Sequence, residues 1–593
     1  MTVSCAGRIH RPAFLRYTDS PHWALLLAFG LCLLALGIGL RDPWPADEPR
    51  FALIAQEMLQ TGQFWLPQRA GEFYPDKPPV FVWLLALAIA ATGSVRAGFL
   101  LPSLVAAVGI FWLVTDLVRR LYGDRTAWMT GAALMASIQF VLQAKTAQID
   151  MVLTFFTTLG AYGILRHALL GPARGWWLLA WAAVGMGILA KGVGFLPLLL
   201  LPAWGWLAAR GRAPRLRWSE LGLGFLVMLA VVAAWGLPMI VMASQGGDPQ
   251  LAAYRDNILF KQTGRRYAAS WHHLQPWYFY FAEVIPWAWM PLLLAFPWAI
   301  PAWWRRIRRV DARIILPLAG IALILVFFSL SPGKRGVYIL PTIPLLAIAM
   351  APLLPGLWER PALQRTGAVT LGLIGALCLV VGFGGLSGLS SLERLAQRHG
   401  VTPWTWLLFL GLLAAVLVVW IGRRRGMLAL VLWLAAFWAT WSTWGYWLLD
   451  GVRSPRDLMA EVAKITGPGA ALAMPDFDEE FILQARQPMV HFGRSTPSAA
   501  QLSRAFAWLR EKPERRWMLI ERNRKPDLQC AGLAQARDLG YQNGDYWWLI
   551  PATAFSGCEG DETAAPLFVA PTTRGDAVSG SIGTPAIGSN SSQ

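Results

Sequence analysis

Charged side chains are scarce in this sequence. Asp, Glu, Lys and Arg make up 15% of its 593 residues, whereas hydrophobic residues make up 56%. Soluble globular domains carry about 25% charged residues, so the composition excludes a protein dissolved mainly in water. The net charge of +18 comes from Arg clusters between apolar runs, a pattern that membrane topology explains, so nucleic acid is not an expected partner.

Motifs for metals and nucleotides are also missing. The five cysteines, at positions 5, 32, 378, 530 and 558, form no CxxC motif and no Cys/His spacing typical of zinc or haem sites. The sequence has no Gly-rich phosphate loop. No cofactor is therefore expected, and a divalent metal is left open. Cys530 and Cys558 share the last soluble segment, where an oxidising compartment would allow a disulfide between them.

The first apolar run, residues 23–40, lacks a small-x-small cleavage site. It follows Arg8, Arg11 and Arg16, so it predicts an uncleaved anchor after a cytoplasmic N-terminus, residues 1–23. Apolar runs of about 17 to 25 residues recur to position 450, and the Arg clusters between them mark the cytoplasmic side. We expect an all-helical membrane domain over residues 24–450 with about thirteen crossings of a bacterial inner membrane. The expected crossings include 127–146, 193–209 and 278–302, and the run 79–91 is expected to be a juxtamembrane or re-entrant helix.

This threading leaves three substantial segments on the periplasmic side: loops 41–96 and 244–277, and the chain from residue 451. In the last segment, strand-like stretches at 517–521 and 546–551 alternate with helical patterns at 455–465 and 498–509. They predict a small α/β domain over residues 451–556. Residues 557–593 are rich in Gly, Ser, Thr, Ala and Pro, a composition that predicts a disordered tail.

The first loop carries adjacent acids, Asp47 and Glu48, followed by Arg50 at the start of an amphipathic helix predicted from about 50 to 59. Carboxylates at a helix N-terminus gain ~0.3 to 1 kcal/mol from the helix dipole, so a capped surface helix is the alternative to a catalytic pair. Lys77, next to Asp76, precedes Pro78 and Pro79. At the membrane surface it would either snorkel or bind the phosphate of a lipid substrate.

Further candidates lie in three other turns of the membrane domain. Asp150 sits between two apolar runs, where an unpaired carboxylate is costly; the alternative to a catalytic role is a salt bridge with Lys145 or a helix cap. Lys191 lies on the same expected face and either contributes to the site or snorkels. The remaining basic and aromatic candidates are Lys261 and Arg265 in the second loop, and Lys334, Arg335 and Tyr338 in the SPGKRGVYILP turn. Binding to anionic lipid is the alternative for the second loop.

Five of these segments together resemble the C-type glycosyltransferase superfamily over about residues 20 to 450. The likeness is strongest to the bacterial lipid A aminoarabinose transferase branch, which is related to protein O-mannosyltransferases. The segments are DEPRFA at 47–52, YPDKPP at 74–79, the turn ending at Asp150, AKG at 190–192, and KRGVYILP at 334–341.

The resemblance implies an inverting transfer of a sugar, with 4-amino-4-deoxy-L-arabinose as the candidate, from undecaprenyl (polyprenyl) phosphate to a periplasmic acceptor such as lipid A of lipopolysaccharide. The family's first-loop acid corresponds to Asp47, its second acid to Asp150, its phosphate-facing lysine to Lys77 and its late tyrosine to Tyr338. Two departures concern the substrates: Asp76 stands where this branch usually has Glu, and the second loop lacks the usual acidic pair, His and Arg, so that Lys261 or Arg265 takes the place of that Arg.

The expected site has two groups of residues. The catalytic set is Asp47, Glu48 and Asp150, and the substrate-binding set is Arg50, Lys77, Lys191, Lys261, Arg265, Lys334, Arg335 and Tyr338. Two alternatives remain open: a protein O-mannosyltransferase-like enzyme, and a polytopic lipid or sugar transporter. A transporter should show internal repeats and ionisable residues near the membrane midplane, whereas the sequence shows no clear repeat and gathers its unusual ionisable residues at one face.

Overall fold

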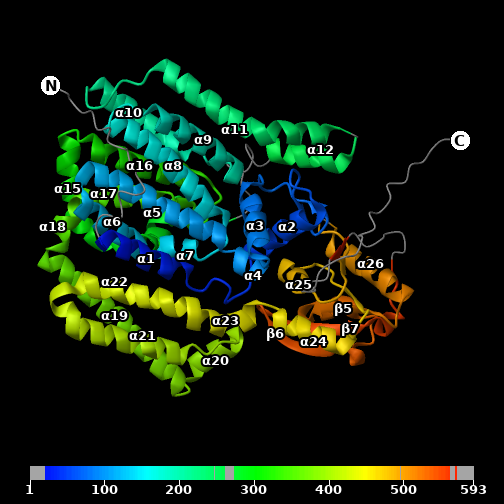
Figure 1. Ribbon diagram of the computed structural model, residues 1–593. Coiled ribbons are helices and arrows are strands. Elements are labelled where there is room, and N and C mark those ends of the chain that lie inside the picture. The colour runs from blue at the N-terminus through cyan, green and yellow to red at the C-terminus, as the bar shows by residue number, and fades with distance from the viewer. Residues whose placement is uncertain (1–20, 246, 261–272, 495, 561–567, 571–593) are drawn as a thin grey trace, which may run out of the picture. The chain divides into compact units, whose positions relative to one another are not determined.

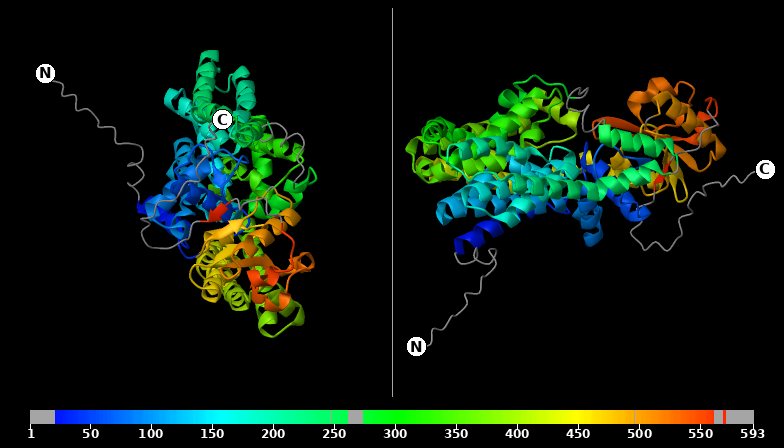
Figure 2. Two further views of the ribbon diagram at one scale, coloured as in Figure 1. Left: turned by 90° about the vertical axis from the view of Figure 1, so that its right-hand side faces the viewer. Right: turned by 90° about the horizontal axis from the view of Figure 1, so that it is seen from above.

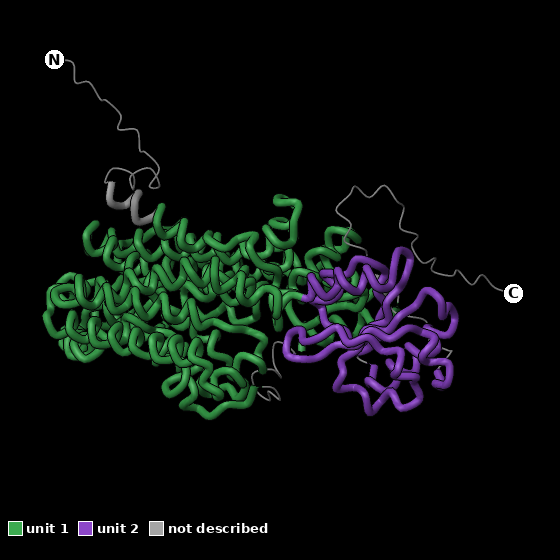
Figure 3. The backbone as a smooth tube through the Cα atoms, turned by 90° about the horizontal axis from the view of Figure 1, so that it is seen from below, with its two compact units in different colours: residues 1–454 green, residues 455–593 purple. Residues whose placement is uncertain are grey.

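A computed structural model describes residues 21–245, 247–260, 273–494, 496–560 and 568–570. The chain divides into two compact units, Met1–Ser454 and Pro455–Gln593, which Figure 3 distinguishes by colour. The division falls close to position 450, where the sequence predicts the end of the membrane domain. Lys261 and Arg265 lie outside the described residues, as do residues 1–20 and most of the segment predicted to be a disordered tail.

In its described part, unit 1 consists of helices and one short β-hairpin. The helices are α1 (Pro21–Ala35), α2 (Glu48–Thr61), α3 (Val80–Thr92), α4 (Val95–Gly98), α5 (Leu101–Tyr122), α6 (Asp124–Ala136), α7 (Ile138–Ala144), α8 (Ile149–Leu169), α9 (Arg174–Lys191), α10 (Leu200–Ala209), α11 (Trp218–Ser244), α12 (Pro249–Asp256), α14 (Ile285–Ala288), α15 (Phe296–Arg308), α16 (Ala312–Leu330), α17 (Thr342–Met350), α18 (Leu354–Trp358), α19 (Pro361–Leu386), α20 (Ser390–His399), α21 (Trp404–Leu417), α22 (Arg423–Thr440) and α23 (Tyr446–Arg453). The hairpin is formed by β1 (Gln68–Arg69) and β2 (Glu72–Phe73), and the single-turn 3₁₀ helix η6 spans Gly336–Ile339.

Among the described residues, seven helical stretches are long and apolar enough to cross a membrane, or up to nine if two bent pairs count as one span each. These helices differ in what covers them. In α8, 78% of the most apolar stretch is buried inside the protein, against 11% in α11 and 17% in α19. A helix that is apolar all round yet largely uncovered needs lipid around it, so α11 and α19 form the outside of a membrane-embedded bundle and α8 its centre.

Two helices that the sequence predicts as continuous crossings are bent. The predicted crossing 127–146 breaks between α6 and α7 with a bend of 69°, and the crossing 278–302 breaks before Leu292 with a bend of 101°. Pro291 lies in the second break, where its ring and missing N–H oppose continuation of the helix. The two sides of each bend together form one apolar stretch, so hydropathy does not reveal the bend.

Glycines allow some neighbouring helices to approach closely. A Cβ atom on Gly367 of α19 would lie 2.7 Å from the backbone nitrogen of Met427 in α22, and one on Gly426 would clash with the carbonyl oxygen of Gln364. Small residues at such contacts are typical of helix pairs in membranes, where close packing replaces the hydrophobic effect as the driving force. Figures 1 and 2 show α19, α21 and α22 running side by side along the remaining long helices.

The short elements of the first loop gather at one end of the long helices. Figure 1 shows α2, α3 and α4 at this end, with α12 beside them. Helix α2 covers the predicted helix at 50–59, and α3 is the short apolar helix expected at 79–91. The start of α5, the start of α8 and the end of α9 lie at the same end (Figure 1).

Unit 2 is a six-stranded mixed sheet with helices. Its elements are α24 (Arg456–Thr466), β3 (Ala471–Ala473), α25 (Glu479–Leu483), β4 (Met489–His491), α26 (Ser498–Glu511), β5 (Arg516–Glu521), β6 (Arg537–Gln542), β7 (Asp545–Pro551) and β8 (Phe568–Ala570). The strand order is β6-β7-β5-β3-β4-β8, with β3 parallel to both β4 and β5. The predicted strands and helices correspond to β5, β7, α24 and α26. Strand β8 lies inside the segment predicted to be disordered, so that prediction is wrong for residues 568–570.

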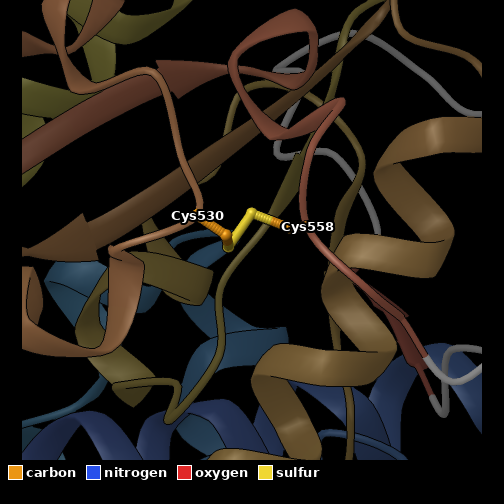
Figure 4. Close-up of a disulfide and its surroundings, with 2 residues drawn as sticks. All are labelled: Cys530 and Cys558. Carbon is orange, nitrogen blue, oxygen red and sulfur yellow. A yellow bond between two sulfur atoms is a disulfide. The ribbon is translucent and has the colours of Figure 1, made fainter.

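Cys530 and Cys558 form a disulfide in unit 2. Figure 4 shows it joining two segments beside the sheet. Cys558 is buried, at 2% exposure, while Cys32 and Cys378 remain free thiols. The bond extends the ordered part of unit 2 past residue 556, where the sequence predicts its end.

Candidate functional site

Asp47 stands at the N-terminus of α2 but does not cap this helix with its side chain. Its carboxylate instead accepts a hydrogen bond from the guanidinium of Arg335 at 2.9 Å and one from the amide of Gln148 at 3.3 Å. The guanidinium of Arg50 lies 3.7 Å away. This arrangement disfavours the capped surface helix as the explanation of Asp47, because the carboxylate reaches two segments that are distant in sequence.

Asp150 lies in the first turn of α8 and pairs with Lys191 at the end of α9. The Lys191 ammonium also lies over the ring of Tyr338, 4.5 Å from its centroid, and makes a cation–π contact with it. The alternative partner, Lys145, turns away from Asp150. Its ammonium donates to the carbonyl oxygens of Leu33, Leu34 and Leu36, at 2.6, 3.3 and 2.9 Å, just beyond α1 and in its last turn.

The two acid–base pairs are joined into one cluster. Gln148, which binds Asp47, is two residues before Asp150 in the chain, and Arg335, which binds Asp47, is three residues before Tyr338. The structure therefore brings together Asp47, Asp150, Lys191, Arg335 and Tyr338, all of which are candidates from the sequence. About one sixth of the Asp47 side chain and two fifths of the Arg335 side chain are exposed, so a ligand can reach this pair.

The contacts of Glu48 disfavour the catalytic role that the sequence suggests. Glu48 is 4% exposed, and its two oxygens accept from the guanidinium of Arg41 at 2.5 and 2.8 Å. They also accept from the backbone N–H groups of Trp44 and Ala147, both at 2.8 Å. A carboxylate saturated in this way has no capacity left for a substrate, and Glu48 instead ties the first loop to the turn that carries Asp150.

Arg41, which the sequence analysis did not single out, is the buried partner of this carboxylate. Besides Glu48 it donates to the carbonyl of Lys145 at 3.1 Å, and the rings of Trp44, Phe99 and Tyr446 surround it at 4.4 to 5.1 Å. Burial alone would lower its pKa, but Glu48 and then Tyr446 raise it above the usual value. The signal in the sequence was only an Arg at the end of an apolar run, which also suits a snorkelling residue.

Lys334 and Arg335, the two basic residues of the SPGKRGVYILP turn, have different surroundings. Lys334 is 4% exposed, and its ammonium donates to the carbonyl oxygens of Gln275 and Ser331 at 2.8 and 2.6 Å. Burial lowers its pKa, and these contacts assign it to fastening the turn, which differs from the substrate-binding role expected. For Arg335, burial would lower the pKa, but the charge of Asp47 and then that of Asp150 raise it.

Lys77 is half-buried in the turn that leads into α3. Gln148 and Arg41 are the residues that sequence reasoning missed. Gln148 acts through Asp47, 101 positions away, and Arg41 acts through the buried Glu48, 7 positions away. Within the described ranges no group of three or more His, Cys, Asp or Glu residues is arranged to hold a metal ion. The described cluster is thus a set of carboxylates and cations at one end of a membrane bundle. It is accessible at Asp47 and Arg335 and largely buried at Asp150 and Lys191, an arrangement suited to binding a phosphate and a polar group next to each other.

The chain is similar to several known proteins. The family described as dolichyl-phosphate-mannose-protein mannosyltransferase matches residues 76–237. An undecaprenyl phosphate-alpha-4-amino-4-deoxy-L-arabinose arabinosyl transferase of Pseudomonas fluorescens (strain Pf0-1) is 32% identical over 387 residues, which are 62% of this chain and 66% of that protein. The protein of the same description from Pseudomonas aeruginosa PAO1 is 33% identical over 369 residues, 59% of this chain and 63% of the relative. The chain thus matches just under two thirds of the length of these relatives.

A solved structure extends the likeness to the fold. The crystal structure of ArnT from Cupriavidus metallidurans bound to undecaprenyl phosphate superposes with a TM-score of 0.69 at 20% identity, covering 89% of this chain and 97% of that one. The apo form of the same protein gives a TM-score of 0.67. The structural matches show a shared fold, and together with the sequence relatives they confirm the resemblance to the C-type superfamily that the sequence motifs indicate.

Proposed function

Because the chain is a relative of the C-type glycosyltransferases, in sequence and in fold, we propose that it is a membrane glycosyltransferase that takes its sugar from a polyprenyl phosphate. One observation carries the proposal: the accessible Asp47–Arg335 pair and the largely buried Asp150–Lys191 pair form a single cluster. Transfer from a phosphate-linked sugar requires a cation for the leaving phosphate and an acid–base or orienting group for the acceptor, and this cluster contains both.

The proposed reaction breaks the bond between the anomeric carbon and the phosphate oxygen. An acceptor oxygen forms its bond to the opposite face of that carbon, so the configuration inverts, and polyprenyl phosphate leaves. Negative charge grows on the phosphate oxygen in the transition state, where fixed cations stabilise it most. Arg335, Lys77 and Arg50 are the basic residues assigned to this role, with Lys261 and Arg265 as further candidates from the second loop.

Asp47 is the residue assigned to the acceptor. If the acceptor is a hydroxyl group, the carboxylate takes its proton as a general base. If the acceptor is a phosphate that is already ionised, Asp47 orients sugar and acceptor instead. Asp150 holds Lys191 and, through it, the ring of Tyr338, so it shapes the wall of the site that faces Asp47.

For the substrates we propose 4-amino-4-deoxy-L-arabinose as the sugar, undecaprenyl phosphate as its carrier and lipid A as the acceptor. The names of the Pseudomonas relatives support the donor, and no nucleotide or metal is part of the proposal. A protein O-mannosyltransferase-like activity is the second candidate, favoured by the family match over residues 76–237. Mass spectrometry of lipid A and of total glycoproteins from a deletion strain decides between them, since only one of the two should lose a sugar.

The proposed enzyme is a multi-pass protein of the bacterial inner membrane, with about thirteen crossings and its site on the periplasmic side. Loops 41–96 and 244–277 and unit 2 lie on that side in this proposal. The disulfide between Cys530 and Cys558 supports it, because disulfides persist in the periplasm and not in the cytosol. A transporter, the alternative from another class, would carry its ionisable cluster at mid-depth and expose it alternately to both sides.

The side of unit 2 can be tested with a single substitution. Cys558→Ser leaves Cys530 as a free thiol, and Cys530 is exposed. We expect a membrane-impermeant maleimide added to spheroplasts to label this variant, while the wild type is labelled there only after reduction. Labelling that requires prior lysis of the spheroplasts would place unit 2 in the cytosol and contradict the proposed topology.

Donor binding should depend on the cations of the cluster. We expect Lys77→Ala and Arg335→Ala each to weaken binding of polyprenyl phosphate by roughly 10- to 100-fold, the usual cost of losing a hydrogen bond to a charged group. Binding can be measured on purified protein by competition with a phosphate analogue. Arg309→Ala, in a predicted cytoplasmic cluster, is the matched control and should bind as the wild type does. Unchanged binding in both site variants would remove these residues from the phosphate site.

A further inference from the structure

Glu57 is a buried acid of α2 that the proposed chemistry does not use. It lies nine residues after Glu48 on the helix that begins at the site. Its side chain is 4% exposed, and one carboxylate oxygen accepts a hydrogen bond of 2.7 Å from the backbone N–H of Gly71. Burial raises its pKa to about 7, against the opposing effect of the Gly71 and Ala70 N–H groups. A buried carboxylate needs a specific hydrogen-bond partner, and the partner of Glu57 is the tip of the β1–β2 hairpin.

The hairpin tip is a strained turn. Gln68 pairs with Phe73 and Arg69 with Glu72, so Ala70 and Gly71 form a two-residue turn, with φ angles of 52° and 77°. Positive φ at both positions is the geometry of a type I′ turn, which favours Asn or Gly at the first position. Ala70 is an unfavourable residue there and is fully buried. The turn therefore needs support from outside the hairpin, and the Glu57 carboxylate supplies it.

The hairpin leads directly to the proposed phosphate-binding residues. Its closing bond runs from the N–H of Tyr74 to the carbonyl of Pro67 at 2.8 Å. The Tyr74 hydroxyl is hydrogen-bonded to Arg50, which lies 3.7 Å from Asp47. Lys77 follows three residues after Tyr74, immediately before the two prolines that precede α3. A shift of the hairpin thus moves both Lys77 and the partner of Arg50.

The other side of the hairpin contacts the second loop. The ring of Phe73 meets that of Tyr254 in α12 edge to face, with centroids 6.0 Å apart, and Tyr254 is 2% exposed. Helix α12 precedes the basic stretch of the second loop. The hairpin is therefore a joint between the first loop, which carries Asp47 and Lys77, and the second loop, with Glu57 holding its tip.

We propose that Glu57 is a positioning residue for the donor phosphate: by clasping the tip of the β1–β2 hairpin, its carboxylate sets where Lys77 lies. This inference rests on the proposed glycosyltransferase function. Glu57 touches no substrate. Its contribution is made before the donor arrives, so its loss raises the KM for the polyprenyl-phosphate sugar and leaves the rate of the bound complex nearly unchanged.

Two substitutions at this position separate the carboxylate from its volume. Glu57→Met keeps the length but removes the acceptor, and should raise the KM for the polyprenyl-phosphate sugar on the order of tenfold with kcat changed less than about twofold. Glu57→Gln retains one carbonyl acceptor for the Gly71 N–H and should restore most of the donor affinity. Thr61→Val, which removes a hydroxyl bonded to the Glu57 carbonyl on the same helix, is the control and should leave KM unchanged.

Amide hydrogen exchange reports on the contact between Glu57 and the hairpin tip, and it does not require an active enzyme. Peptides covering residues 68–74 should exchange faster in Glu57→Met than in the wild type, while Glu57→Gln and Thr61→Val remain close to it. Gly71→Ala attacks the same contact from the hairpin, because a Cβ opposes φ = 77° there. This variant should reproduce the rise in KM even if Glu57→Met does not fold.

The outcomes distinguish a failure of the proposed glycosyltransferase function from a failure of the positioning role of Glu57. If the wild type transfers no sugar from any polyprenyl-phosphate donor, the proposed function fails and the positioning role fails with it. If the wild type is active but Glu57→Met and Gly71→Ala keep a normal KM, only the positioning role is overturned. Equal losses of kcat and thermal stability in Glu57→Met and Glu57→Gln, with no separate change in KM, would overturn it as well.

Discussion

Asp47→Asn and Asp150→Asn should each abolish sugar transfer while the protein still inserts into the membrane. Both substitutions keep the shape of the side chain and remove its charge. Asp47→Asn leaves Arg335 and Arg50 without their anion and removes the group assigned to the acceptor. Losing a general base typically costs 10²- to 10⁴-fold. Asp150→Asn removes the anion that holds Lys191 over the ring of Tyr338, so the wall of the site that faces Asp47 loses its arrangement.

The measurement is transfer from a polyprenyl-phosphate sugar to an acceptor in membrane vesicles, with membrane fractionation as the check on insertion. Asp248→Asn is the matched control, because Asp248 caps α12 at an exposed position and should retain full activity. Undiminished transfer in both Asp47→Asn and Asp150→Asn would refute the site. If only Asp47→Asn loses transfer activity, the catalytic set is confined to the first loop and Asp150 does not belong to it.

Glu48→Ala should have the largest effect on stability. It leaves the Arg41 guanidinium buried without its carboxylate, and breaking one partner of a buried ion pair typically costs about 3 to 5 kcal/mol. The substitution also removes the acceptor for the N–H of Ala147, so the Asp150 turn loses its tie to the first loop. We expect a markedly lower melting temperature of the purified protein in detergent.

A double-mutant cycle shows whether the pair acts as a unit. Arg41→Ala with Glu48→Ala should cost much less than the sum of the two single substitutions, because contacting residues are coupled. The control is Glu359→Ala, which breaks the exposed pair with Arg125, where both side chains are about 70% exposed. Surface pairs contribute at most about 1 kcal/mol. Similar melting temperatures for Glu48→Ala and Glu359→Ala would contradict the buried tie.

The sequence identified the residues that lie together in the cluster better than it identified their partners. Asp47, Asp150, Lys191, Arg335 and Tyr338 were all selected, because ionisable groups in short turns between apolar runs are conspicuous. Which acid pairs with which base was not predictable. Asp150 meets Lys191, 41 residues later, whereas the nearby Lys145 reaches back to the end of α1. Contacts of this kind depend on how helices pack, and hydropathy carries no information about packing.

Residues that act through others were the hardest to recognise. Glu48 looked catalytic because it adjoins Asp47, yet its position one residue later on the helix points it inward to Arg41. Glu57 lies in the helix predicted from about 50 to 59, and the role proposed for it rests on its contact with the hairpin, which only the structure shows. The two bent crossings were missed for a related reason: the apolar pattern continues across each break.

The hydrogen bond between Arg335 and Asp47 joins residues 288 positions apart. During synthesis the ribosome adds Asp47 long before it adds Arg335, the cation that completes the pair. The helices between the two residues are made and inserted first. For most of synthesis, therefore, the turn that carries Asp47 lacks its partner Arg335. A nascent chain stopped before residue 335 would hold its early helices in the bilayer yet bind no phosphate through this pair, so catalytic competence arises late in biogenesis.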